Sequence, residues 1–229
     1  MSVFFRRRGE PPATFDSIFA NNSWEAIIAA CQSGNVPDSW AVGDNKMMTI
    51  NGTDYQIDII GKNHDTYTAG GTAPLTFQMH DCYSVAKNMN SSNTNEGGWT
   101  DCAMRSTHLP EILALMPTEV QNGIREVNKL TSAGNMSSTI NTTADKLFLL
   151  SEIEIFGSVT YSVAGEGSQY SYYSAGNSTL KNRNGSAYYW LERSPDGRDS
   201  MRFCCVHNNG TAYYISAPFP RGMAFAFCF

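Results

Sequence analysis

The clearest pattern of apolar and polar positions is a helical one near the N-terminus, in SWEAIIAACQS at residues 23–33. Its large apolar side chains are three or four residues apart, which brings them to one face of a helix. Ser23 is a residue type that caps helix N-termini, and Gly34 is the type that ends helices. The pattern predicts a helix whose buried face is formed by Trp24, Ile27, Ile28 and Cys31.

Alternation of apolar and polar residues follows between residues 40 and 61. It is interrupted by Asn51-Gly52, a dipeptide typical of two-residue β-hairpin turns. We therefore predict a hairpin over this stretch, and a further strand over residues 75–80.

The middle of the chain mixes helical and strand-like patterns. Residues 81–89 predict a short helix, and residues 100–115 and 118–128 predict a pair of helices, the second capped by Thr118. Residues 146–156, KLFLLSEIEIF, predict a strand that leads into a short turn or helix.

From residue 157 onward the chain is rich in Gly, Ser, Asn and Tyr, which is typical of short strands and long ordered loops. Strand-like pieces follow one another at 188–192, 201–207, 211–215 and 223–229. In the last piece, large residues alternate with small ones from Met223 to Phe229, so this strand is expected to be buried on both faces. With helices early and a meandering sheet late, the predicted fold class is α+β.

Composition limits the possible partners. The 229 residues suffice for one large domain or a domain with a short appendage. Charged residues make up only 16% and the net charge is −5, which gives no electrostatic footprint for nucleic acid. The basic cluster Arg6–Arg8 lies in a segment of poor periodicity. We therefore predict an N-terminal arm over residues 1–20 and one domain over residues 21–229.

No apolar run approaches the length needed to span a bilayer, so membrane insertion is not expected. Met1–Phe5 places apolar residues before the arginines, the reverse of the order in a secretion signal. The protein is therefore expected to be made in the cytoplasm and to remain there unless it leaves by another route.

Cysteines and histidines form no recognisable motif. The six cysteines lack CxxC spacing, and most of them are expected to be buried, reduced and small hydrophobic residues, with a Cys204–Cys228 contact left open. The histidines stand at no metal-ligand spacing, and a histidine followed by an aspartate, as in His64-Asp65 and His80-Asp81, need not pair with it in space. No metal and no cofactor is predicted.

Acidic residues invite a catalytic interpretation, but a structural one is favoured. Glu152 and Glu154 are expected on a solvated strand face between buried isoleucines, rather than as a pair for acid–base work or calcium binding. Gly165-Glu166-Gly167 is expected to form a tight turn.

The last forty or so residues, from Tyr188 to Phe229, interleave aromatic rings with short polar residues. Large amphipathic rings beside Asn, Ser, Thr and Arg are typical of interface hot spots. Trp190 and Phe203 are expected in the core. Because no catalytic constellation accompanies these rings, the sequence predicts a binding module and not an enzyme.

A series of motifs runs in order from about Trp24 to the last residue, of which EGSQY (166–170) and W-x-E-R-S-P (190–195) are fairly specific. The others are WAVGD (40–44), IDIIGKNHD (57–65), LTFQMHDC (75–82), KLFLLSEIEIFG (146–157) and MAFAFCF (223–229). Together they resemble a domain family of unknown function that is common in gut bacteria and their prophages and is often attached to phage structural proteins.

The late pattern also resembles the variable proteins of diversity-generating retroelements. That resemblance implies a C-type lectin-like fold with a C-terminal antiparallel sheet, long ordered loops and a variable region over residues 188–229. In such systems a reverse transcriptase alters adenines, so asparagine codons become codons for residues such as Tyr, Ile and Ser. Relatives carry runs of Asn in the stretch that matches Ala212–Ser216. The implied ligand-binding positions are Tyr189, Leu191, Arg198, Asp199, Ser200, Arg202, Cys205, His207, Tyr213, Tyr214, Ile215, Ser216 and Phe219.

The function that this resemblance implies is a phage or prophage tail-associated receptor-binding protein, assembled in the host cytoplasm and located in the virion. Its expected partners are a bacterial cell-surface protein or glycan and other tail proteins, with a homo-oligomer as a further option through the arm. Two alternatives stay open. One is an enzyme of the formylglycine-generating class, which shares the fold and would need a reactive Cys204 or Cys205. The other is a structural virion subunit without a ligand.

Overall fold

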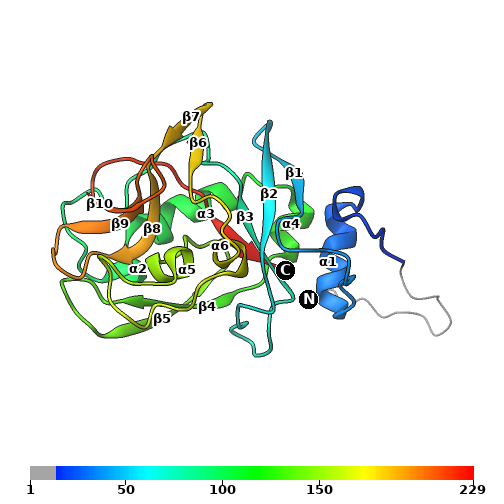
Figure 1. The fold of residues 1–229 in the computed structure, drawn as a ribbon, viewed down its shortest axis with the longest axis horizontal. Coiled ribbons are helices and arrows are strands. Elements are labelled where there is room, and N and C mark those ends of the chain that lie inside the picture. The colour runs from blue at the N-terminus through cyan, green and yellow to red at the C-terminus, as the bar shows by residue number, and fades with distance from the viewer. Residues whose placement is uncertain (1–13) are drawn as a thin grey trace.

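Antiparallel β-sheets and short helices make up the part of the chain that the structure, a computed structural model, describes, which is residues 14–229 (Figure 1). This mixed architecture agrees with the predicted α+β class. The largest sheet has four strands in the order β1-β2-β3-β11 and runs through the middle of the molecule. Its strands are β1 (Asn45–Ile50), β2 (Thr53–Lys62), β3 (Leu75–Met79) and β11 (Ala226–Cys228).

The hairpin between β1 and β2 confirms the turn predicted from sequence. Ile50 pairs with Thr53 across the turn. Asn51 and Gly52 have φ angles of 49° and 75°, which the type I′ turn requires at both central positions. Asparagine and glycine tolerate this left-handed region, so the local sequence sets the register of the whole hairpin.

Helix α1 (Trp24–Ser33) confirms the predicted N-terminal helix. The Ser23 side chain accepts a hydrogen bond from the Ala26 backbone N–H, and Gly34 ends the helix in the left-handed conformation. The helix packs on the end of the chain, since the rings of Trp24 and Phe229 are 6.0 Å apart. The segment from Met223 to Phe229 is buried along its whole length, as its alternation predicted.

The segment 81–89 was predicted to be helical, and this prediction is wrong. Its backbone N–H groups bond to distant segments, among them Tyr83 to the Met223 carbonyl and Lys87 to the Arg221 carbonyl. These long-range hydrogen bonds keep the segment extended. The predicted helix over 118–128 ends early for a related reason, because its last residues join a strand. The helices of this region are α2 (Gly98–Asp101), the π-helical turn η2 (Met104–His108), α3 (Leu109–Leu113) and α4 (Thr118–Gly123).

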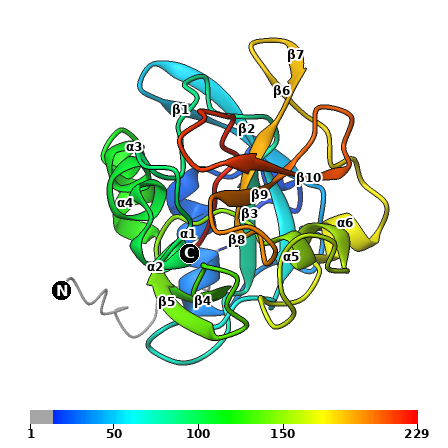
Figure 2. The ribbon, with the colours of Figure 1, turned by 90° about the vertical axis from the view of Figure 1, so that its left-hand side faces the viewer.

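Three smaller sheets complete the fold. The strands β10-β9-β8 form a sheet at the end of the molecule opposite α1, facing the viewer in Figure 2. Two hairpins, β4–β5 and β6–β7, lie below and above it in Figure 1. Their bounds are β4 (Val127–Ser132), β5 (Ile140–Asp145), β6 (Lys181–Arg183), β7 (Ser186–Tyr188), β8 (Trp190–Pro195), β9 (Arg202–Val206) and β10 (Ala212–Ser216).

The strand predicted at the start of residues 146–156 is absent, and the segment is extended with a single bridge from Phe148 to Ala226. The helix α5 (Glu152–Phe156) follows it, as the alternative of a short helix allowed. Ser151 and Glu154 form a reciprocal capping box at its start. A further short helix, α6 (Ser171–Ser174), packs against β2.

Most of the predicted arm over residues 1–20 lies outside the described residues, but its last part belongs to the domain. Phe19 begins the short helix η1 (Phe19–Asn21) and is 1% exposed, with its ring 5.3 Å from that of Trp40. The domain therefore begins before residue 21. Within residues 14–229, no helix has both the length and the apolar character needed to cross a membrane.

Candidate functional site

The three-stranded sheet presents its outermost strand, β10, to the surface. Strand β8 is buried at every position, β9 is buried from Phe203 to Val206, and the residues of β10 are exposed or half-buried. Tyr213 pairs with Cys205, which in turn pairs with Leu191. Backbone hydrogen bonds hold β10 to β9. Because this pairing does not use the side chains of β10, these can serve another purpose.

Aromatic rings cluster on this sheet. The Tyr189 hydroxyl and His207 Nε2 are 2.6 Å apart, in hydrogen-bonding contact. The Tyr213 ring lies 6.0 Å from the Tyr189 ring and 5.1 Å from the His207 ring. Tyr213 stacks on Tyr214 with ring centroids 4.9 Å apart. Tyr214 meets Tyr161, from the loop after α5, at 5.1 Å.

Arginines cover several of these rings. Arg202 lies over Tyr214, with Cζ 4.5 Å from the ring centroid, and Arg198 lies over Tyr161 at 4.2 Å. Arg221 lies over Tyr189 at 5.4 Å. We call this set the tyrosine–arginine surface, and it consists of Tyr161, Tyr189, Arg198, Arg202, His207, Tyr213, Tyr214 and Arg221.

The residue types of this surface are those that occur at interaction surfaces between macromolecules. Tyrosine and arginine are the residue types enriched at interface hot spots, and guanidinium groups over rings add cation–π attraction. Two clefts within residues 14–229 lie elsewhere, and Lys146 lines both of them. A small ligand prefers a concave apolar pocket, whereas a macromolecule can contact an open surface.

Six of the thirteen sequence-predicted positions belong to the tyrosine–arginine surface: Tyr189, Arg198, Arg202, His207, Tyr213 and Tyr214. Five others lie beside it at least partly exposed, with Phe219 the most open at 54%; the remaining four are Asp199, Ser200, Ile215 and Ser216. Asp199 forms an ion pair with Arg202 at 3.2 Å.

Leu191 and Cys205 need correction, because both are 0% exposed. They lie opposite each other on β8 and β9, the two buried strands of the sheet. Strand β8 packs against β4 and α2 as well as β9, which leaves neither of its faces in solvent. These two side chains are part of the core and not of the surface.

The loops that carry this surface are held by two residues, Glu152 and Asn95. Neither was predicted from the sequence to support the site. The Glu152 carboxylate accepts hydrogen bonds from the backbone N–H groups of Thr160, Tyr161 and Ser162 at 2.8–3.0 Å. The solvated strand face expected for Glu152 and Glu154 is wrong, since both are buried on a helix. The carboxylate of Glu152 instead positions the ring of Tyr161.

Asn95 plays the same part for the loop between β8 and β9. Its side-chain amide donates to the carbonyls of Asp199 at 2.8 Å and Arg202 at 2.7 Å, and its oxygen accepts from the Asn135 N–H at 2.7 Å. The signal in the sequence is only a polar loop, SSNTNEGG. Because the partners are forty or more residues away, local patterns could not reveal this role.

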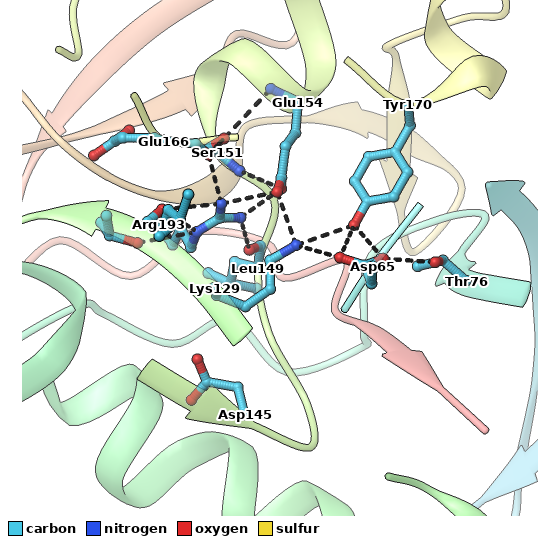
Figure 3. A network of polar contacts seen from close by, with 12 residues as sticks. Asp65, Thr76, Lys129, Asp145, Leu149, Ser151, Glu154, Glu166, Tyr170 and Arg193 are labelled. Carbon is cyan, nitrogen blue, oxygen red and sulfur yellow. Dashed lines mark hydrogen bonds and ion pairs between the residues drawn. The ribbon is translucent and has the colours of Figure 1, made fainter. Parts of the chain in front are cut away.

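Beneath the surface, the motifs EGSQY and W-x-E-R-S-P meet in a buried polar network (Figure 3). Arg193 of β8 pairs with Glu154, with Nη2 and Oε1 2.9 Å apart, and donates to the carbonyl oxygens of Leu149 and Glu166. Lys129 of β4 bridges Glu154 and Asp65, each at 2.8 Å. Buried charges are tolerated only where they are paired in this way.

The pKa values in the network follow from burial and pairing. Burial acts to raise the pKa of Glu154, but Arg193 and Lys129 outweigh it and the pKa lies below its usual value. For Asp65, burial is likewise outweighed, chiefly by Lys129, and the pKa falls to about 2. Burial raises the pKa of Glu166 to about 7.

Glu192 has no partner for either carboxylate oxygen among the described residues. Burial, with Glu152 and Glu166 nearby, raises its pKa well above the usual value.

All six cysteines are buried and free, including Cys205, whereas burial was predicted for most of them. The Cys204 thiol lies 3.8 Å from the Pro195 carbonyl and the Cys228 thiol 3.5 Å from the Thr76 hydroxyl, so these two cysteines have separate neighbours. Burial raises the pKa of the Cys204 and Cys205 thiols, whereas a nucleophilic thiol needs a lowered pKa. Residues 14–229 contain no group of three or more His, Cys, Asp or Glu side chains arranged for a metal ion.

The histidines pair with residues other than their sequence neighbours. His80 contacts Asp58 of β2, with Nδ1 and Oδ2 2.6 Å apart, while Asp81 accepts from the Asn182 N–H. His64 stacks on Tyr170, and Asp65 belongs to the buried network.

Replacing Asp58 with asparagine is expected to lower the pKa of His80. The hydrogen bond to Asp58 is the main cause that raises this pKa above 6.5. A raised pKa stabilises the fold below about pH 6.5, and the contribution is lost as the pH rises through the folded-state value. The ring is 46% exposed, so screening limits the contribution to under about 1 kcal/mol. NMR titration of the His80 ring measures the change, with His108 as the control, and an unchanged titration contradicts the pairing.

Comparison with known proteins identifies one family. A family described as Domain of unknown function (DUF6273) matches residues 76–228, about two thirds of the chain. The match includes both EGSQY and W-x-E-R-S-P, and it leaves the stretch from Trp24 to Leu75 outside. No curated protein and no solved structure matches the chain.

Proposed function

Since the chain belongs to this family of domains of unknown function (DUF6273), we propose its function from its surface: it is a receptor-binding protein associated with a phage or prophage tail. The observation that carries the proposal is the tyrosine–arginine surface on β10 and the adjoining loops. The ligand is a protein or glycan on a bacterial cell.

The contrast between surface and scaffold supports this proposal. Beside the half-buried Tyr189, Trp190 is 0% exposed, and Tyr213, at 37%, pairs with the fully buried Cys205. Side chains on the outer strand can therefore change while the buried strands and the polar network keep the fold.

The same contrast supports diversification by a retroelement. Tyr213, Tyr214, Ile215 and Ser216 are consecutive on the edge strand β10, and all four side chains retain some exposure. Each can arise from an asparagine codon by changes at adenines. This part of the proposal requires that the DNA beside the gene contain a reverse transcriptase gene and a near-copy of the 3′ end that differs only at adenines. Sequencing that DNA tests it.

A C-type lectin-like fold is proposed on the same resemblance. In support of it, helix α1 and the C-terminal segment pack together, with the rings of Trp24 and Phe229 6.0 Å apart, and the last strand, β11, pairs with β3. The long intervening chain carries the three-stranded sheet to the end of the molecule opposite α1 (Figure 1).

Replacing Tyr213 and Tyr214 together with alanine is expected to reduce binding to bacterial cells at least 100-fold. Hot-spot aromatics each contribute about 2 kcal/mol or more to binding. Because the rings are partly exposed on an edge strand, the free energy of unfolding should change by less than about 1 kcal/mol. Binding of the labelled protein to a panel of gut bacteria measures the first quantity, and urea unfolding measures the second.

The matched control is Tyr172→Ala, which removes a half-buried tyrosine on α6. This variant should bind as the unchanged protein does. A large stability loss in the double variant would show that the two rings belong to the core. Unchanged cell binding by the double variant would show that the surface does not bind the receptor.

A further inference from the structure

The tyrosine–arginine surface contains one arginine with no acidic partner. Arg198 pairs with Asp196 at 3.3 Å and Arg202 with Asp199 at 3.2 Å. Arg221 makes no ion pair with any described residue, and its Nη1 donates only to the neighbouring Pro220 carbonyl. Its Nε is buried without a hydrogen-bond partner among the described residues. A buried donor left unpaired is costly. Because Nε itself is closed to solvent, a ligand reaches the half-buried Arg221 through its Nη groups.

A second donor lies beside Arg221. The Asn209 backbone N–H donates to His207 Nδ1 at 3.3 Å, so in the neutral ring the proton is on Nε2. Nε2 then donates to the Tyr189 hydroxyl oxygen, 2.6 Å away. This leaves the O–H of Tyr189 free to donate to a ligand, and the guanidinium of Arg221 lies over the ring of the same tyrosine.

We infer that Arg221, Tyr189 and His207 form a subsite for a carboxylate-bearing sugar on the ligand. The inference rests on the proposed function and gives its ligand a chemical class. The guanidinium and the free phenol O–H both donate to the carboxylate, and hydrogen bonds to an ionised group are the stronger kind. His207 positions the phenol through its own hydrogen bond.

The neighbouring residues favour a saccharide over an acidic peptide. The rings of Tyr189 and Tyr213, whose faces are electron-rich, offer platforms for the weakly positive C–H groups of a sugar ring. Asn208, Asn209 and Thr211 are exposed beside His207 and can exchange hydrogen bonds with hydroxyl groups. A ligand with hydroxyl groups and one carboxylate uses all of these features.

An oligosaccharide array tests the inference. It carries acidic oligosaccharides of the galacturonic, glucuronic and sialic types, their carboxyl-reduced counterparts, and poly-glutamate peptides. The unchanged protein should bind at least one acidic oligosaccharide, and the reduced counterpart at least tenfold more weakly. Arg221→Gln should weaken binding of the acidic form about 10- to 100-fold and remove its preference over the reduced form.

Arg183→Gln is the matched control. Arg183 also lies over a tyrosine, Tyr188 at 5.1 Å, but it belongs to the β6–β7 hairpin. This variant should keep both the affinity and the preference. Absence of binding to any acidic oligosaccharide, equal binding of reduced forms, tighter binding of poly-glutamate, or an equal loss in Arg183→Gln would each overturn the inference.

Cell binding separates this inference from the proposed function. If the Tyr213 and Tyr214 variant loses cell binding while Arg221→Gln keeps it, the receptor-binding function stands and the carboxylate subsite falls. If neither variant loses cell binding, both fall.

Discussion

Replacing Arg193 with methionine is expected to lower the free energy of unfolding by about 3–5 kcal/mol, the usual cost of breaking a buried ion pair from one side. Arg193 is 0% exposed and pairs with Glu154, which is 2% exposed. The substitution leaves this carboxylate with Lys129 as its only cationic partner. It also removes the donors that reach the carbonyls of Leu149 and Glu166. Urea unfolding measures the loss.

A double-mutant cycle with Glu154→Gln isolates the pair. The double variant should lose less than the sum of the two single variants, because the second substitution removes the charge that the first leaves unpaired. Arg198→Met is the control, since Arg198 is 57% exposed in its pair with Asp196 and should change stability by less than about 0.5 kcal/mol. A loss below about 1 kcal/mol for Arg193→Met would mean that the network does not hold the sheet.

The buried network also shows where sequence reasoning stopped. Glu154 and Glu152 were expected in solvent because acidic residues on a short apolar segment usually are. Their burial depends on Arg193 and on the loop at Thr160–Ser162, which no local pattern connects to them. Charged residues in a core are predictable only when their partners are known.

Elements set by local chemistry were predictable. The Asn51-Gly52 hairpin needs positive φ angles that these residues tolerate, and α1 needs the cap and stop that Ser23 and Gly34 supply. The segment 81–89 failed because its backbone hydrogen bonds go to the C-terminal segment, so tertiary pairing overrode its helical pattern.

The sequence indicated which part of the chain carries the candidate surface, but not all of the residues that form it. The rings of Tyr213 and Tyr214 stood out by composition. Leu191 and Cys205 were misplaced because the resemblance that named them does not tell which side chains of β8 and β9 are covered by neighbouring elements. Tyr161 and Arg221 were missed because they join the surface through contacts with residues distant in the sequence, which no local pattern reveals.

Replacing Asn95 with aspartate is expected to cost about 3 kcal/mol or more at pH 7, although the shape of the side chain hardly changes. The amide nitrogen donates to the carbonyls of Asp196, Asp199 and Arg202, and a carboxylate oxygen there would face three acceptors without a proton to share. Asn95 is 0% exposed, so water cannot relieve the repulsion. Urea unfolding measures the loss, which should be smaller at pH 5 than at pH 7, because the introduced carboxyl group can then bind a proton and donate it.

Asn93→Asp is the control for that substitution, since Asn93 is exposed in the same loop, and its stability should change by less than about 0.5 kcal/mol. If both variants behave alike, Asn95 does not anchor the loop between β8 and β9. If only Asn95→Asp loses stability, cell binding should weaken along with it, because Arg198 and Arg202 reach the tyrosine–arginine surface from that loop and its end. A loop freed from its anchor must be ordered again on binding, and that ordering costs about 0.5–1.5 kcal/mol for each immobilised side chain.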